Sequence, residues 1–118
     1  MTGNELLDAA LALFAETDAS DETYRALAVP YINTVLAEAF NCNNRIRRFN
    51  GISAHSMIPA ITSLSDEIDY EEELLRSALP YGLAAKLYFD EDNDGRLSYF
   101  NQEYANRLAE ADKWVVTF

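Results

Sequence analysis

The side chains most capable of chemistry in this sequence lie between Asp90 and Asn101, in the stretch DEDNDGRLSYFN. An EF-hand calcium loop takes oxygen ligands at positions 1, 3, 5, 7, 9 and 12, needs glycine at position 6, and has a bidentate glutamate at position 12. Positions 1, 3, 5, 6 and 9 match this pattern: Asp90, Asp92, Asp94, Gly95 and Ser98. Position 12 does not match, because Asn101 offers one neutral oxygen where the ion needs a carboxylate.

We therefore interpret this segment as a connection between two helices, in which Asn93 and Asp94 form a turn and Gly95 supplies a positive φ. The missing glutamate is the ligand that closes a calcium site around its ion, and the sequence contains no second loop of this kind. A small calcium-responsive binding module that uses Asp90, Asp92, Asp94 and Ser98 is the alternative. The prediction is that the chain holds neither a metal nor a cofactor.

Other catalytic patterns are missing from the sequence. His55 is the only histidine, and no nucleophile elbow accompanies the serines near it, so we expect it to be polar surface. Cys42 is the only cysteine, which excludes an internal disulfide or a cysteine-based zinc site and indicates a small buried or half-buried apolar side chain. The four glycines form no phosphate-binding loop. These observations predict a protein that is not an enzyme.

Length and composition are those of one globular domain. The chain has 118 residues, 49% of them apolar, and we expect a helical domain over residues 1–113 followed by a tail over residues 114–118. No apolar run approaches the roughly 20 residues that cross a bilayer, and the acidic start lacks the basic region of a signal peptide, so an intracellular protein without membrane contact is expected. The net charge of −11 disfavours general binding of nucleic acids.

One short segment departs from this acidic composition. Residues 43–49, NNRIRRF, bring together Arg45, Arg47 and Arg48. We favour ion pairs between these arginines and acidic residues of the same protein or of a neighbouring subunit over a contact with nucleic acid. They are also the residues that we select for a contact with a protein partner.

Apolar periodicity predicts about four helices and therefore an all-α bundle. The first follows a cap at Thr2 or Asn4, and the second covers residues 24–40, is kinked by Pro30 and ends near the asparagines at 41, 43 and 44. A long irregular arm, residues 51–70, comes next, and a segment of this length either contains a short pair of strands or has a specific role. The third helix begins at 70 or 71 and is kinked by Pro80, with Gly82 allowing close approach of another helix, and the fourth runs from 97 or 98 to about 113 with Phe100, Tyr104 and Leu108 on one face.

The second half of the chain resembles the head-tail connector, or adaptor, proteins of tailed bacteriophages and their prophages. The matching stretches are Leu64 to Ile68 (LSDEI), Leu79 to Ala85 (LPYGLAA), Asp90 to Asp94 (DEDND) and Tyr99 to Tyr104 (YFNQEY). The resemblance covers about half of the chain, and the first helices follow the family only in outline. It is a similarity of packing residues.

This resemblance implies a structural role in virion assembly. Such proteins form a ring below the portal protein, extend the DNA channel and offer a platform to the next tail-completion protein. The implied location is the head-tail joint of the virion, after synthesis in the cytoplasm of the bacterial host. DNA would pass through without specific binding, which suits an acidic wall.

Two segments are candidates for partner contacts under this interpretation. The arm is a candidate for contact with neighbouring subunits. The tail is apolar and β-prone, and its side chains would become ordered on a partner: Trp114, Val115, Val116 and Phe118. The alternative for the tail is that Trp114 covers one end of the bundle.

Overall fold

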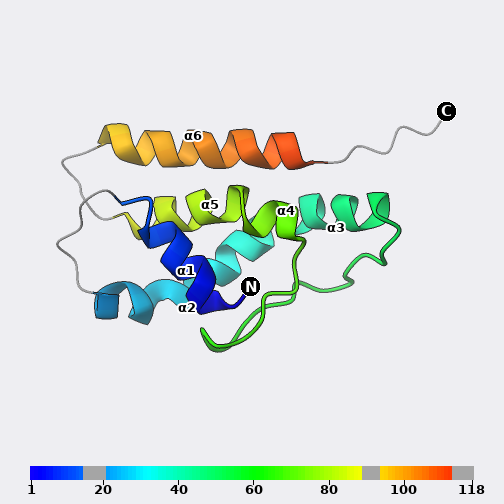
Figure 1. Cartoon of the computed structure of the whole chain (residues 1–118), viewed down its shortest axis with the longest axis horizontal. Coiled ribbons are helices and arrows are strands. Elements are labelled where there is room, and N and C mark those ends of the chain that lie inside the picture. The colour runs from blue at the N-terminus through cyan, green and yellow to red at the C-terminus, as the bar shows by residue number, and fades with distance from the viewer. Residues whose placement is uncertain (15–20, 89–93, 113–118) are drawn as a thin grey trace.

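The computed structural model describes residues 1–14, 21–88 and 94–112, and within these ranges the chain forms six α-helices and no β-strand (Figure 1). The all-α class is therefore confirmed, with two helices more than expected. The helices are α1 (Gly3–Leu11), α2 (Asp21–Glu38), α3 (Phe40–Phe49), α4 (Glu72–Leu75), α5 (Ala78–Leu87) and α6 (Asp94–Ala111).

Helix α1 begins at the cap that the sequence predicts. Thr2 Oγ1 accepts a hydrogen bond from the backbone N–H of Glu5 at 3.2 Å, and the Glu5 carboxylate accepts one from the N–H of Thr2 at 3.1 Å. This reciprocal capping box satisfies two donors at the helix end that would otherwise lack partners. It directs the apolar face of α1, which carries Leu6, Leu7 and Ala10, into the core.

The asparagine-rich segment lies inside a helix, and its predicted role as a helix end is wrong. Helix α2 includes Pro30 and ends at Glu38. Ala39 separates α2 from α3, and α3 continues through the asparagines to Phe49. Asparagine is a poor helix former because its side chain competes for backbone hydrogen bonds. Here Asn43 and Asn44 are buried and bond to segments outside the helix, which offsets that cost.

A break at Arg76 and Ser77 replaces the single kinked helix expected over residues 70–87. A proline ring clashes with the carbonyl of the residue four positions earlier, which for Pro80 is Arg76. One continuous helix cannot run through both positions without distortion. The chain instead ends α4, restarts, and places Pro80 in the first turn of α5, where its missing N–H costs nothing.

Helix α6 begins at Asp94, three residues before the predicted start, so Gly95 belongs to its first turn. Among the described glycines only Gly51 has a positive φ, and the left-handed turn predicted at Gly95 is wrong. The predicted packing face of α6 is confirmed. Phe100 is buried, while Tyr104 and Leu108 pack against the core.

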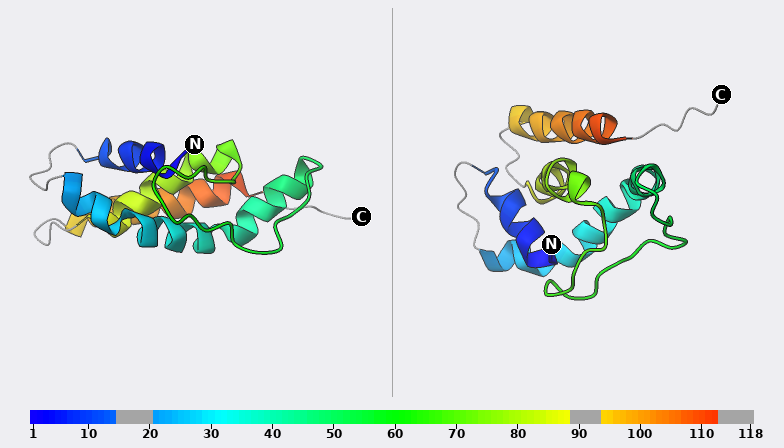
Figure 2. Two further views of the ribbon diagram at one scale, coloured as in Figure 1. Left: turned by 90° about the horizontal axis from the view of Figure 1, so that it is seen from below. Right: turned by 45° about the vertical axis from the view of Figure 1, so that its right-hand side comes forward.

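Helix α5 is central to the bundle, with α6 along one side and α1 and α2 on the other (Figures 1 and 2). Its buried residues include Leu79, Leu83, Ala84 and Leu87. Gly82 faces the ring of Tyr104, and a methyl group at Gly82 would lie 2.8 Å from that ring. The predicted close approach at Gly82 is therefore confirmed.

The molecule is elongated and flat, with extents of 51 × 30 × 17 Å. The arm, residues 51–70, leaves the end of α3 and returns across the outside of the bundle to α4 (Figure 1). Among the described residues, no helix is both long and apolar enough to cross a membrane.

Candidate functional site: the anchored arm

The arm is an irregular segment with a specific path. Its first turn is a Schellman motif: Gly51, at φ +76°, donates to the carbonyl of Arg48 at 3.1 Å, and Ile52 donates to the carbonyl of Arg47 at 2.8 Å. A glycine suits this position because a side chain is strained at a positive φ. The motif satisfies the last carbonyls of α3 and directs the chain out of the helix.

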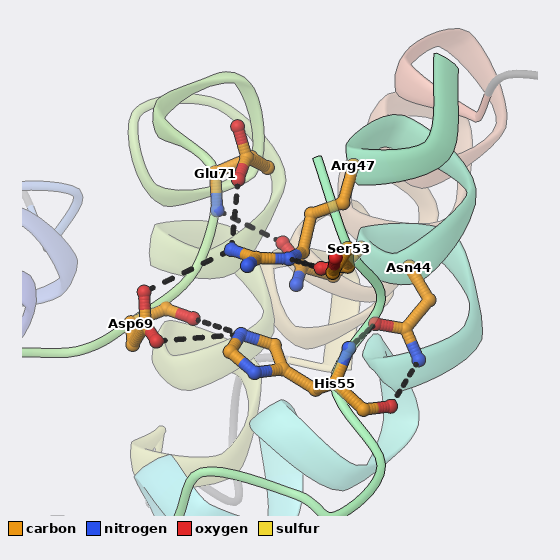
Figure 3. Close-up of polar contacts among 7 residues, drawn as sticks. Asn44, Arg47, Ser53, His55, Asp69 and Glu71 are labelled. Carbon is orange, nitrogen blue, oxygen red and sulfur yellow. Dashed lines mark hydrogen bonds and ion pairs between the residues drawn. The ribbon is translucent and has the colours of Figure 1, made fainter. Parts of the chain in front are cut away.

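Two asparagine side chains hold the backbone of the arm. Asn44 Nδ2 donates to the carbonyl of His55 at 3.0 Å, and Asn44 Oδ1 accepts from the N–H of His55 at 2.8 Å (Figure 3). Asn33 of α2 pairs with Ile61 in the same way, with both hydrogen bonds at 2.9 Å. Each amide satisfies the donor and the acceptor of one arm residue, which an irregular segment cannot satisfy within itself.

A third asparagine fixes the end of the arm. Asn43 is fully buried, and its Oδ1 accepts from the N–H of Glu71, the residue that precedes α4, at 2.8 Å. Its Nδ2 has no hydrogen-bond partner among the described residues. The oxygen of Asn43 therefore sets where α4 begins relative to α3.

Arg47 joins the two ends of the arm. Its Nε donates to the carbonyl of Ser53 at 2.7 Å, and its guanidinium lies 3.3 Å from Glu71 Oε1 and 3.9 Å from Asp69 Oδ1 (Figure 3). The side chain is 15% exposed, so these contacts are partly shielded from water. An arginine suits this position because its planar group offers several donors in fixed directions.

His55 adds a contact between the outgoing and the returning halves of the arm. Its Nε2 lies 2.8 Å from the carbonyl of Asp69, which makes this nitrogen the donor, and its ring stacks on Tyr70. Tyr70 is itself buried and donates from its hydroxyl to the carbonyl of Leu36. His55 is thus a packing and hydrogen-bonding residue, and the expectation that it is polar surface is wrong.

The returning half of the arm is tied to the start of the chain. Gly3 donates to the carbonyl of Asp66 at 3.1 Å, and Asn4 donates to the carbonyl of Leu64 at 2.8 Å. Asp66 Oδ2 accepts from the N–H groups of Thr62 and Ser63, and these backbone hydrogen bonds lower the pKa of Asp66. Ile61 and Ile68 then enter the core, so the returning half of the arm is fixed to the bundle.

The predicted arginine cluster is divided between two roles. Arg45 forms a bidentate ion pair with Asp112, at 2.6 and 2.7 Å, which fastens α3 to the end of α6, and Arg47 belongs to the arm anchors. The expectation of ion pairs within the chain is met for both. Arg48 is exposed, and no acidic side chain of the described part pairs with it.

The other predicted site residues lie away from the arm. Asp94 and Ser98 lie at the start of α6, whereas Asp90 and Asp92 fall outside the described residues. Because α6 begins at Asp94, positions 5 to 12 of the calcium pattern are helical, whereas an EF-hand makes a sharp turn at position 6. The predicted tail contacts also fall outside the described residues: Trp114, Val115, Val116 and Phe118.

The anchor residues Asn33, Asn43, Asn44 and Arg47 were not recognised from the sequence as a group, apart from Arg47 in the basic cluster. Two asparagines in the middle of a helix with apolar neighbours are a usable signal, since a buried amide must find partners outside the helix.

Cys42 is buried as expected, and burial raises the pKa of its thiol to about 11. In the described part of the chain, no three His, Cys, Asp or Glu side chains form a group that could hold a metal.

Comparisons of the chain with protein-family models, with curated proteins and with solved structures find no match.

Proposed function

We propose that this chain is a non-enzymatic assembly protein of a bacteriophage head-tail joint, which joins copies of itself and the portal protein through surface contacts. The observation that carries the proposal is the anchored arm. Its backbone is held by hydrogen bonds and ion pairs, while large apolar side chains along it are open to solvent: Ile52 at 42%, Met57 at 78% and Ile58 at 41% exposure.

An arm of this kind is suited to bind a protein. A segment that is ordered before binding loses little conformational entropy on association, so more of the contact energy contributes to affinity. Exposed apolar side chains on an ordered backbone are the usual centre of such contacts. The resemblance of the second half of the chain to head-tail connectors supplies the biological setting.

The charge of the chain fits the same proposal. Connector rings surround DNA, and the net charge of −11 would repel the phosphates from the channel wall. Ionic repulsion of this type lets a duplex slide without being retained.

The test is reconstitution with the portal protein encoded by the same phage or prophage. We expect the purified chain to bind the portal and to form a ring on it that is visible by electron microscopy. Deletion of Val115 to Phe118 is expected to abolish this binding and to leave the helical circular dichroism and the melting temperature unchanged. The control is Ala105→Ser, a small change at an exposed position of α6. This variant is expected to bind the portal as the wild type does.

A wild-type chain that does not bind the portal at any concentration tested would contradict the proposal. Undiminished binding by the tail deletion would contradict only the contact through the tail.

A further inference from the structure

One stretch of this acidic chain contains no acidic residue at all. The sequence holds 20 aspartates and glutamates, and none of them lies between Ala39 and Ser65. This acid-free stretch covers the whole of α3 and the outgoing half of the arm. Helix α3 forms one end of the molecule along its long axis, and the arm runs back from it below the bundle (Figure 1).

Two of the three arginines at this end are paired within the chain. Asp112 from α6 pairs with Arg45, and Glu71 and Asp69 both pair with Arg47. Arg48 has no such partner among the described residues and is exposed. The end of α3 therefore presents one guanidinium group to solvent on a protein whose net charge is −11.

Apolar side chains gather in the same stretch. In the part of the chain that the structure describes, five large hydrophobic side chains are exposed, and four of them lie between residues 49 and 58: Phe49, Ile52, Met57 and Ile58. We call these four residues together with Arg48 the arm-end surface. Apolar groups beside an arginine are the composition typical of the centre of a protein interface.

We propose that the arm-end surface binds the acidic surface of a second copy of this chain. The argument is charge complementarity. Two copies with a charge of −11 repel one another wherever their acidic faces meet, whereas the arm end lies in the longest stretch of the sequence without an acidic residue and exposes Arg48. This inference rests on the proposed function, because it assigns the subunit contact of the assembly to named residues.

The contact must be head-to-tail. Two arm ends that faced each other would offer Arg48 no acidic residue from the acid-free stretch of the other copy, which disfavours a symmetric dimer. At the opposite end of the long axis lie the first turns of α2 and α6, where Glu22 and Asp94 are exposed (Figure 1). A head-to-tail contact repeats from copy to copy, and it closes into a ring when the rotation allows.

Sedimentation velocity of the full chain, across micromolar to millimolar concentration at physiological ionic strength, tests the proposal. We expect the wild type to form species larger than dimers as concentration rises. Met57→Asp and Arg48→Glu are each expected to weaken this association by roughly tenfold or more. The controls introduce the same acidic residues at exposed positions elsewhere: Ala105→Asp on α6 and Arg76→Glu after α4. Both controls are expected to associate as the wild type does.

Several outcomes overturn the proposal: a wild type that is monomeric throughout, a closed dimer as the sole associated species, or arm-end variants that match their controls. A monomeric wild type that associates after removal of residues 113–118 also overturns it, since the tail of the same chain would then be the occupant. Portal binding is measured separately. A chain that binds the portal and shows no arm-dependent self-association contradicts this inference alone, and the reverse result contradicts only the proposed function.

Discussion

Asparagine is used in this protein as a replacement for a backbone peptide group. Asn33 and Asn44 each present a carbonyl oxygen and an N–H donor in the spacing of a peptide, and each pairs with both backbone groups of one arm residue. A β-strand would provide the same pairs from a neighbouring strand. Here two helices provide them, so an irregular segment obtains satisfied hydrogen bonds without a sheet.

Replacing Asn44 with alanine should loosen the arm. The change removes both hydrogen bonds to His55 and leaves its partly buried N–H and carbonyl groups without their partner. We expect a loss of about 1–3 kcal/mol in the free energy of unfolding, measured by urea titration. Hydrogen exchange of the His55 amide should also become faster than in the wild type.

Asn101→Ala is the matched control, since Asn101 is an exposed asparagine in α6. Its free energy of unfolding should stay within about 0.5 kcal/mol of the wild type. Equal effects of the two substitutions would show that Asn44 does not anchor the arm.

Acid should release the turn at Asp66. Hydrogen bonds from Thr62 and Ser63 lower the pKa of Asp66 below its usual value of 3.8, so the ionised carboxylate favours the folded turn. A group whose pKa is lowered by folding stabilises the fold above its unfolded pKa, and that contribution is lost as pH falls through the folded pKa. The amide signals of Thr62 and Ser63 should therefore titrate below pH 3.8 in NMR spectra.

Asp66→Asn supplies the comparison for that titration. Its amide signals at residues 62 and 63 should show no transition with the same midpoint. A midpoint at or above 3.8 in the wild type would contradict the described hydrogen bonds.

At the scale of elements, the closest packing in the bundle is between α5 and α6. Gly82 allows the ring of Tyr104 to lie directly on the α5 backbone, and the Tyr104 hydroxyl then reaches Glu38 of α2 at 3.0 Å. Burial raises the pKa of Tyr104, so the phenol stays protonated and donates to that carboxylate. Lys86 also pairs with Glu38, at 3.1 Å, and three helices meet at this carboxylate.

The substitution Gly82→Ala should separate these helices. A methyl group would lie 2.8 Å from the Tyr104 ring, which is too close for a carbon contact, so the ring or the helix must shift. We expect the free energy of unfolding to fall by about 1–3 kcal/mol, because overpacking forces shifts of side chains and backbone. Thermal unfolding followed by circular dichroism measures the change.

Gly95→Ala is the same chemical change at an exposed position in the first turn of α6. It should raise stability by about 0.5–1 kcal/mol, since alanine is the better helix former. Stabilisation by both substitutions would mean that α5 and α6 are not in close contact at Gly82.

Local signals in the sequence predicted some helix boundaries and missed others. The cap at Thr2 and the face of α6 through Phe100 were predictable because both depend on residues within one or two turns. The break at Arg76 and Ser77 was placed wrongly at Pro80, although proline acts on the carbonyl four residues earlier. The length of α3 was missed because its buried asparagines bond to residues outside the helix.

For the whole molecule, the dominant feature is an acidic charge carried on a thin body. The net charge is −11, and the shortest dimension of 17 Å is smaller than the Debye length of about 30 Å at 0.01 M salt, so acidic groups on opposite faces repel one another at low ionic strength. Their mutual repulsion opposes the compact state. The few ion pairs with arginine and lysine offset only part of it.

Added salt should therefore stabilise the protein. We expect the melting temperature to rise when sodium chloride is increased from about 0.01 M to about 0.15 M, because screening shortens the Debye length from about 30 Å to about 8 Å. Differential scanning calorimetry measures the change. A fall in the melting temperature would mean that ion pairs outweigh repulsion.

Calcium chloride and magnesium chloride at matched ionic strength extend this measurement to the calcium alternative. Equal effects of the two salts are expected from screening alone. A larger stabilisation by calcium, lost in Asp94→Asn, would support the binding module that uses Asp90, Asp92, Asp94 and Ser98.

The sequence predicted where the candidate site lies but not which contacts anchor it. The length and irregular composition of residues 51–70 indicated either a short pair of strands or a segment with a specific role, and the described residues form no strand. Its path depends on contacts between residues far apart in the chain, such as Asn33 with Ile61 and Arg47 with Glu71. No local pattern encodes such pairs, because each forms only after the helices have packed.

The anchoring of the arm has a consequence for how such a protein can vary. Asn33 binds the backbone of Ile61 and Asn44 that of His55, and backbone atoms are the same whatever side chain the residue carries. Outward positions such as Met57 can therefore be exchanged without moving the arm. Related chains could therefore bind different partner surfaces through single substitutions at the outward positions, while the backbone path of the arm stays the same.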